Sequence, residues 1–276
     1  MRVAFITPVP ELERFATASD YHLILTHICD QYPEYVEFYR ERSKAGDYII
    51  LDNSAYELGE SVSIELLRKY ADIIEPAVVV LPDVRNDAKE TLRRTREAIE
   101  VLKDPRWTLM AVPQAPDTDN KDHDFEAWVA SLKQMYEFPE IGAIGIYPET
   151  SWFFPTPRRG RVELAEILEE RGLIRKDRTY HMLGMTDNPV ELKGLSQFEW
   201  IMGCDSAKPL VQGMHGVLLH PKEGLLTIRP RRPKDYFSRS FDEFQALCVR
   251  YNQSVILSWA KGKDGPSWKE FLSNLQ

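Results

Sequence analysis

The segment YIILDNSAYELGESVSIELLRKYADIIEPAVVVLPDV, residues 48–84, contains two predicted strands with a helix between them. The runs 48–54 and 77–83 are rich in Ile, Val and Leu, which is typical of strands that are buried on both faces. Between them, residues 63–74 form an amphipathic segment with helical spacing of its apolar residues. A strand, a helix and a second strand in this order indicate a βαβ unit with parallel strands.

The same alternation continues along most of the chain, and it predicts eight βα units. Such a pattern fits a (β/α)8 TIM barrel of typical size, so we expect a single α/β domain that spans residues 1–276. A doubly wound open sheet is the alternative, but no glycine-rich phosphate loop follows the first strand. The predicted strands are 21–27, 48–54, 77–83, 108–114, 141–147, 179–185, 199–206 and 254–260, and the predicted helices include 33–44, 63–74, 87–102, 161–172 and 241–252.

The composition is that of an ordinary globular protein, with 43% hydrophobic and 28% charged residues among 276. The apolar run at the N-terminus is too short for a signal peptide, and no apolar window of about 18 residues occurs, so we expect a cytoplasmic protein without membrane contact. The three cysteines are far apart and form neither a disulfide framework nor a zinc motif. The formal charge of −8 argues against a general nucleic-acid coat protein, although a local basic patch can still bind.

Polar side chains stand at the ends of several predicted strands: Asp52, Asp83, Gln114 and Asp205. In a barrel these strand ends lie on one face, where the loops build the active site. A strand-end aspartate can instead cap the next helix, and for Asp83 the two interpretations have equal weight. Asp52 and Asp205 are predicted to be functional, because no helix is expected directly after either one.

Two carboxylates in one pocket can divide the chemical work. If their environments separate their pKa values, one can act as the nucleophile and the other as the general acid or base. This arrangement is used in reactions at the anomeric carbon of a sugar. At this stage a glycosidase, a glycosyl-transferring enzyme and a lyase all fit the pattern.

The motifs ILDNSAYE, LPDV, VPQ, AIGIY, HMLGM and MGCDSAKP, in this order, resemble the strand-end motifs of the tRNA-guanine transglycosylases. The resemblance is stronger to the shorter relatives, found in phages and in bacterial DNA-modification clusters, that insert 7-deazaguanine bases into DNA. It implies a pentosyltransferase that exchanges guanine for a base such as preQ0 through a covalent aspartyl-glycosyl intermediate. Two alternatives are a tRNA-guanine transglycosylase that lacks zinc and a non-catalytic nucleic-acid-binding barrel. A glycosidase that acts on free nucleosides is a third.

The resemblance also implies roles for individual residues. Asp205 matches the family's nucleophile, and Asp52 matches its second catalytic aspartate. Five more residues match positions around the bound base: Tyr56 as a stacking ring, Asp83 as the reader of the base edge, Gln114 as an amide contact, Gly145 as a backbone contact and Leu183 as an apolar cover.

The chain departs from the family in the missing zinc cluster, at Glu57, in the turn Asn53-Ser54-Ala55 and in the segment SAKPL after Asp205. It lacks the cluster of three Cys and one His that holds zinc in the tRNA enzymes, and His215 with His220 is a weak metal candidate, so we expect neither zinc nor another cofactor. Glu57 stands where the relatives carry a glutamine, and its role stays open. The expected partners are DNA, with tRNA as the alternative, and the free 7-deazaguanine base; the oligomeric state is left open.

Two proline-bounded basic segments, FFPTPRRGR (153–161) and IRPRRPKDYFSR (228–239), are expected to rise from the same face of the barrel. Their position favours contact with a phosphate backbone over a merely solvated arginine face. His27 and His181 are predicted to be structural, because neither has a partner at a defined spacing. The residues predicted to contact nucleic acid are Arg158, Arg159, Arg161, Arg229, Arg231, Arg232 and Lys234.

Overall fold

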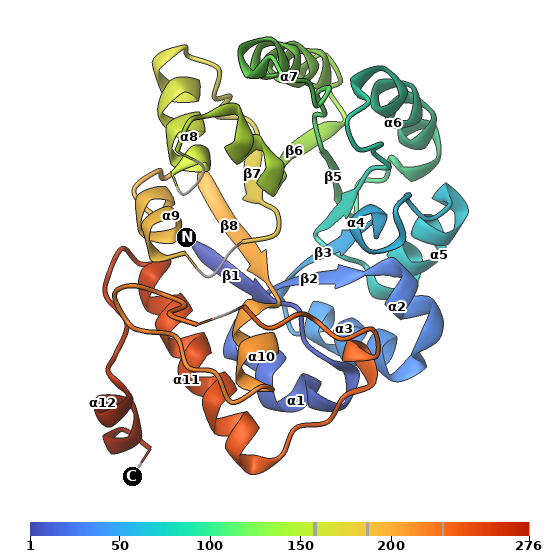
Figure 1. Cartoon of the computed structure of the whole chain (residues 1–276). Coiled ribbons are helices and arrows are strands. Elements are labelled where there is room, and N and C mark those ends of the chain that lie inside the picture. Colours follow the sequence, from blue (N-terminus) through green and yellow to red (C-terminus); the bar gives the residue numbers. More distant parts are fainter. Residues whose placement is uncertain (157–158, 186–187, 228, 276) are drawn as a thin grey trace.

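A computed structural model of the chain describes residues 1–156, 159–185, 188–227 and 229–275. At its centre lie eight parallel strands in the order β1-β8-β7-β6-β5-β4-β3-β2, and helices surround them (Figure 1). β1 and β2 lie side by side, so the ring is closed and the chain is a single-domain α/β barrel, as the sequence predicts. The strands are β1 Arg2–Phe5, β2 Tyr21–Leu25, β3 Tyr48–Asp52, β4 Val78–Val80, β5 Thr108–Ala111, β6 Ile141–Ile146, β7 Thr179–Met182 and β8 Ile201–Ser206.

The outer layer consists of helices that follow the strands along the chain. Short 3-10 turns complete the loops. The helices are α1 Leu12–Phe15, α2 Thr26–Gln31, α3 Pro33–Lys44, α4 Ala55–Leu58, α5 Ile64–Ile74, α6 Ala88–Leu102, α7 Lys121–Tyr136, α8 Gly160–Glu170, α9 Pro189–Leu195, α10 Lys208–Gly213, α11 Glu243–Trp259 and α12 Trp268–Ser273, and the 3-10 turns are η1 Val9–Glu11, η2 Ala16–Ala18, η3 Pro148–Phe153 and η4 Tyr236–Ser238. None of the described helices is both long and apolar enough to cross a membrane.

The strands are apolar at successive positions because they are covered on both faces. In β3, Ile49, Ile50 and Leu51 are all fully buried. The parallel register places Leu51 beside Ile24 of β2 and beside Val79 of β4. Burial on both sides removes the alternation of polar and apolar residues that a half-exposed strand would show.

The predicted number of strands is correct, but one predicted strand is wrong and one observed strand was not predicted. The run 254–260, predicted as the eighth strand, belongs to α11. Val255, Ile256 and Trp259 are buried on one side of that helix, so an apolar run that was interpreted as a strand is the core-facing stripe of a helix. The strand that the sequence analysis did not predict is β1, which pairs with β8 through Val3 and Cys204. Its four residues are too few to show a recognisable strand pattern in the sequence.

The correction shifts every predicted strand number by one. Asp52 ends the third strand rather than the second, and Asp205 lies in the eighth rather than the seventh. β2 also ends earlier than expected, at Leu25, so His27 lies in α2 rather than at a strand end. The convergence of strand ends on one face does not depend on this numbering, because all eight strands are parallel.

Candidate functional site

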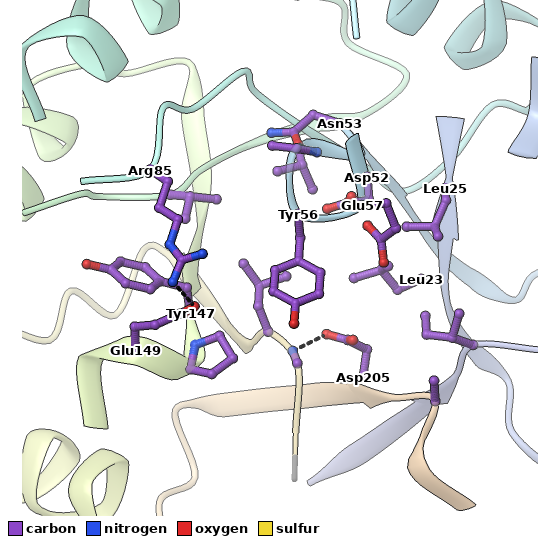
Figure 2. A pocket seen from close by; sticks show the side chains of 18 of the residues that line it. Leu23, Leu25, Asp52, Asn53, Tyr56, Glu57, Arg85, Tyr147, Glu149 and Asp205 are labelled. Carbon is purple, nitrogen blue, oxygen red and sulfur yellow. Dashed lines mark hydrogen bonds and ion pairs between the residues drawn. The ribbon is translucent and has the colours of Figure 1, made fainter. Parts of the chain in front are cut away.

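A cavity of about 870 Å³ opens at the carboxyl ends of the strands. Its wall includes side chains from β3, β8 and the loops around them, and Figure 2 shows Tyr56, Asp52, Glu57 and Asp205 facing the same space. Six of the residues predicted for the site line this cavity: Asp52, Tyr56, Asp83, Gln114, Leu183 and Asp205.

Asp205 is held by hydrogen bonds to one of its two carboxylate oxygens. The amide N–H of Gly184 donates to Oδ1 at 2.9 Å, and Nε2 of His181 lies 3.0 Å from the same oxygen. With Nε2 of His181 as the donor to this oxygen, its Nδ1 accepts from the Tyr21 hydroxyl at 2.7 Å. Among the described residues, Oδ2 has no hydrogen-bond partner. A chain of Tyr21, His181 and Asp205 therefore fixes the carboxylate and leaves Oδ2 for a ligand.

The sequence did not predict the contact between His181 and Asp205. His181 was predicted to be structural, yet it lies in β7 and its ring reaches the proposed catalytic aspartate. The parallel register pairs His181 with Gly203, so it lies beside the strand that carries Asp205. A histidine inside a strand that the sequence predicts to be buried was the available signal.

Asp52 occupies a different environment from Asp205. It ends β3, and the N–H of Ser54 donates to its Oδ1 at 2.7 Å. Ser54 has a left-handed backbone conformation, with φ at 63°. Burial raises the pKa of Asp52 well above its ordinary value, and the neighbouring negative charge of Glu57 raises it further. These effects favour the protonated form of Asp52.

Asp83 and Gln114 form one hydrogen-bonded group with Asn53. The side-chain N–H groups of Asn53 and Gln114 donate to the two Asp83 oxygens at 2.8 and 2.7 Å. Asp83 is not a helix cap, because the Asp87 side chain accepts from Glu90 and caps α6. Burial raises the pKa of Asp83 to about 6, although the hydrogen bonds from Asn53 and Gln114 lower it. The group therefore presents a half-buried carboxylate to the pocket.

The raised pKa of Asp83 predicts a specific dependence of stability on pH. Between pH 4 and 6 the folded protein binds more protons at this residue than the unfolded chain, so its contribution to the free energy of unfolding falls as pH rises. A shift of about two pKa units corresponds to about 3 kcal/mol. We expect urea unfolding of the wild type and of Asp83→Asn to show a stability difference that falls across this window, whereas Asp119→Asn, at an exposed aspartate, should show none. A difference for Asp83→Asn that is flat with pH would contradict the burial of a titrating carboxyl.

Tyr56 and Glu57 follow Asp52 on the short helix α4. The Tyr56 side chain is 76% exposed and lies over the pocket in Figure 2, where a flat ligand could stack on it. Glu57 forms an ion pair with Arg232, with Oε1 and Nη2 3.1 Å apart. Burial raises the pKa of Glu57, and the Arg232 charge opposes this rise. Glu57, whose role the sequence left open, therefore anchors a loop that comes from beyond β8.

Leu183 lines the pocket, but Gly145 does not. A Cβ atom at Gly145 would lie 2.9 Å from Leu183 Cδ1 and 3.1 Å from Val112 Cγ2. Both of these side chains line the pocket wall. Gly145 therefore provides the space in which Leu183 and Val112 pack, and it acts behind the wall rather than as the predicted backbone contact.

The two basic segments differ in what they contribute. In the first, Arg158 lies outside the described residues, and Arg159 forms an ion pair with Glu166. The prediction that Arg161 contacts phosphate is wrong, because its side chain is fully buried. In the second, Arg229, Arg231 and Arg232 line the rim of the cavity, and Lys234 is exposed outside it.

No cluster of three His, Cys, Asp or Glu side chains suited to a metal ion occurs within residues 1–156, 159–185, 188–227 and 229–275. The imidazole rings of His215 and His220 both form hydrogen bonds with backbone groups. Nδ1 of His215 lies 2.8 Å from the Val211 carbonyl oxygen, and Nδ1 of His220 accepts from the N–H of Glu223 at 3.2 Å. Their geometry gives no indication of a metal site.

Comparison with known proteins finds no matching family model and no matching curated protein. Among solved structures, N-acetylneuraminate lyase from Mycoplasma synoviae is similar, with a TM-score of 0.48 and 13% sequence identity over 93% of this chain and 97% of that chain. So remote a likeness does not define the reaction of this chain.

These findings correct the family predicted from the sequence motifs. No transglycosylase model matches the chain, and one solved structure of similar fold is named as a lyase. The predictions of a guanine transglycosylase, of a pentosyltransferase and of base exchange in DNA or tRNA are therefore withdrawn. Short motifs at strand ends recur in barrels with many chemistries, because the fold supports different reactions by variation of its loops. Binding of DNA, of tRNA or of a free base stays a prediction that no observation tests.

Proposed function

We propose that the chain is a glycosidase that hydrolyses the bond between the anomeric carbon of a sugar and a planar leaving group. One observation carries this proposal: Asp205 and Asp52 line the same pocket in opposite environments. The Asp205 carboxylate accepts hydrogen bonds from the Gly184 N–H and from His181, whereas burial and the charge of Glu57 raise the pKa of Asp52 and favour its neutral form. A charged and a protonated carboxyl in one pocket is the pattern that glycoside hydrolysis requires.

The reaction follows from this division of roles. As the bond to the leaving group breaks, positive charge develops at the anomeric carbon, and Oδ2 of Asp205 stabilises it. The electron pair of the bond goes to the leaving atom, which takes the proton of Asp52. Water supplies the hydroxyl group at the anomeric carbon and returns a proton to Asp52.

The remaining pocket side chains suit a flat leaving group with polar edges. Tyr56 offers an exposed ring for stacking, and Leu183 offers an apolar contact. Asp83, fixed by Asn53 and Gln114, can accept from N–H or O–H donors of the ligand.

A substrate panel tests the proposal. The purified protein is incubated with nitrophenyl glycosides and with nucleosides, and release of the leaving group is measured by absorbance and chromatography, with N-acetylneuraminate as a separate arm. We expect release from at least one glycoside or nucleoside, with water as the acceptor, and release that is slower by about 10³-fold with Asp205→Asn. Consumption of N-acetylneuraminate alone, or no release from any panel member, would overturn the proposal.

Replacement of Glu57 by Gln is expected to change the pH dependence of this activity. The charge of Glu57 raises the pKa of Asp52, so its removal lowers that pKa and the activity is lost at a lower pH. We expect the alkaline limb of kcat/KM to move down by up to about one pH unit. Glu60→Gln removes a neighbouring charge at the pocket rim and serves as the control. A limb that stays in place in Glu57→Gln, or moves equally in Glu60→Gln, is inconsistent with coupling between Glu57 and Asp52.

The cytoplasmic location predicted from the sequence remains part of this proposal. Cys29, Cys204 and Cys248 are free, buried thiols, which suits a reducing compartment.

A further inference from the structure

Arg161 is a buried arginine whose three side-chain nitrogens each contact an acceptor. It lies in the first turn of α8 and is 0% exposed. Nε donates to Glu191 Oε1 at 2.6 Å, Nη1 donates to the Leu183 carbonyl oxygen at 2.6 Å, and Nη2 lies 3.1 Å from the Met185 sulfur. The planar guanidinium group therefore holds the loop after β7 through its contacts with Leu183 and Met185.

The Leu183 carbonyl belongs to the same peptide group as the Gly184 N–H, and that N–H donates to Oδ1 of Asp205 at 2.9 Å. Figure 2 shows this bond at the pocket wall. One peptide unit thus accepts from Arg161 on one side and donates to Asp205 on the other. The charge of Arg161 polarises the peptide, which strengthens the bond that its N–H makes to the carboxylate.

The peptide is also restrained in its orientation. Gly184 has φ at 59°, and a Cβ atom there would lie 2.8 Å from Pro148 Cγ. The next residue, Met185, donates its N–H to the Asp205 carbonyl oxygen at 2.7 Å and accepts from the Ser206 hydroxyl at 3.1 Å. The loop is therefore joined to β8 at Asp205 and at Ser206.

We propose that Arg161 is a positioning residue for Asp205, and that it acts through the Leu183–Gly184 peptide. It holds the peptide so that the N–H points at Oδ1, and Oδ2 is left toward the pocket. The consequence for catalysis rests on the proposed glycosidase function, whereas the positioning itself does not. A buried ion pair that served stability alone could be replaced by apolar residues of similar volume at little cost.

Amide hydrogen exchange tests the positioning without any substrate. In ¹⁵N-labelled protein, the exchange of the Gly184 amide is compared between the wild type and Arg161→Met, with the Val79 amide of β4 as a reporter of global stability. Loss of a charge-assisted hydrogen bond should speed exchange at Gly184 by about tenfold relative to Val79. Arg171→Met, at an exposed arginine directly after α8, is the matched control and should leave both amides unchanged.

Arg161→Lys provides a second variant if the methionine variant does not fold. Lysine keeps the buried positive charge beside Glu191 but lacks the planar fork that reaches the Leu183 carbonyl, so Gly184 should again exchange faster. Unchanged exchange at Gly184 in a folded variant, or an equal change at Val79, would overturn the proposal. Where the panel has identified a substrate, kcat should fall with KM unchanged. A protein without glycosidase activity whose Gly184 amide still responds refutes the proposed reaction and leaves the positioning intact.

Discussion

Asp205→Asn is expected to reduce kcat by about 10³-fold, the loss that follows removal of one preorganised electrostatic group from a site of this kind. The substitution keeps an oxygen that can accept from Gly184 and His181, so the local geometry should survive. It removes the negative charge that faces the developing positive charge at the anomeric carbon. The measurement compares kcat on the panel substrate and the temperature of thermal unfolding between the wild type and Asp205→Asn.

Asp235→Asn is the matched control for this substitution. Asp235 lies at the surface, paired with Arg239, so its replacement should change neither rate nor unfolding temperature appreciably. Retention of wild-type kcat in a folded Asp205→Asn variant would remove Asp205 from the mechanism. A loss of activity that accompanies unfolding would be a stability effect, and circular dichroism separates the two.

Asp52→Asn is expected to reduce kcat by about 10²–10⁴-fold, the usual contribution of a general acid. The loss should depend on the leaving group. A substrate that releases a poor leaving group, such as an unsubstituted phenol, needs the proton of Asp52, whereas dinitrophenolate leaves without it. The ratio of the two rates in the wild type and in the variant therefore isolates the acid function.

The same substitution should stabilise the free protein at neutral and alkaline pH. The raised pKa of Asp52 means that the folded protein holds its proton more tightly than the unfolded chain, so ionisation of this carboxyl costs folding free energy as pH rises. Asparagine has no such cost. An equal loss of rate on both leaving groups, or a variant that is less stable than the wild type at pH 8, would be inconsistent with a buried acid.

The sequence was sufficient to predict the barrel and the convergence of its carboxylates. Alternating apolar runs and amphipathic segments indicate parallel strands, and parallel strands bring Asp52, Asp83 and Asp205 to one face whatever their distance in the chain. The same pattern could not distinguish the strand expected at 254–260 from the buried stripe of α11, because a short apolar run fits both.

The side-chain contacts that orient the site residues could not be predicted from local sequence patterns. Tyr21 and His181 are 160 residues apart, and Glu57 and Arg232 are 175 apart, so neither pair has a spacing that sequence can reveal. Arg161 stands in a basic run, which is typical of a surface. Its burial depends on Glu191 and the Leu183 carbonyl, which only the folded chain places opposite it. The family assigned from the strand-end motifs was wrong for a related reason: the motifs report the barrel face and not the reaction.

The pH dependence of kcat/KM on the best panel substrate tests the central claim, which is that Asp52 is the protonated partner of Asp205. We predict that kcat/KM of the wild type falls as pH rises through the pKa of Asp52, because the acid form is lost. In Asp52→Asn that alkaline limb should be absent, and the remaining slow activity should be independent of pH over the same range. An alkaline limb that persists at the same pH in Asp52→Asn would contradict the account.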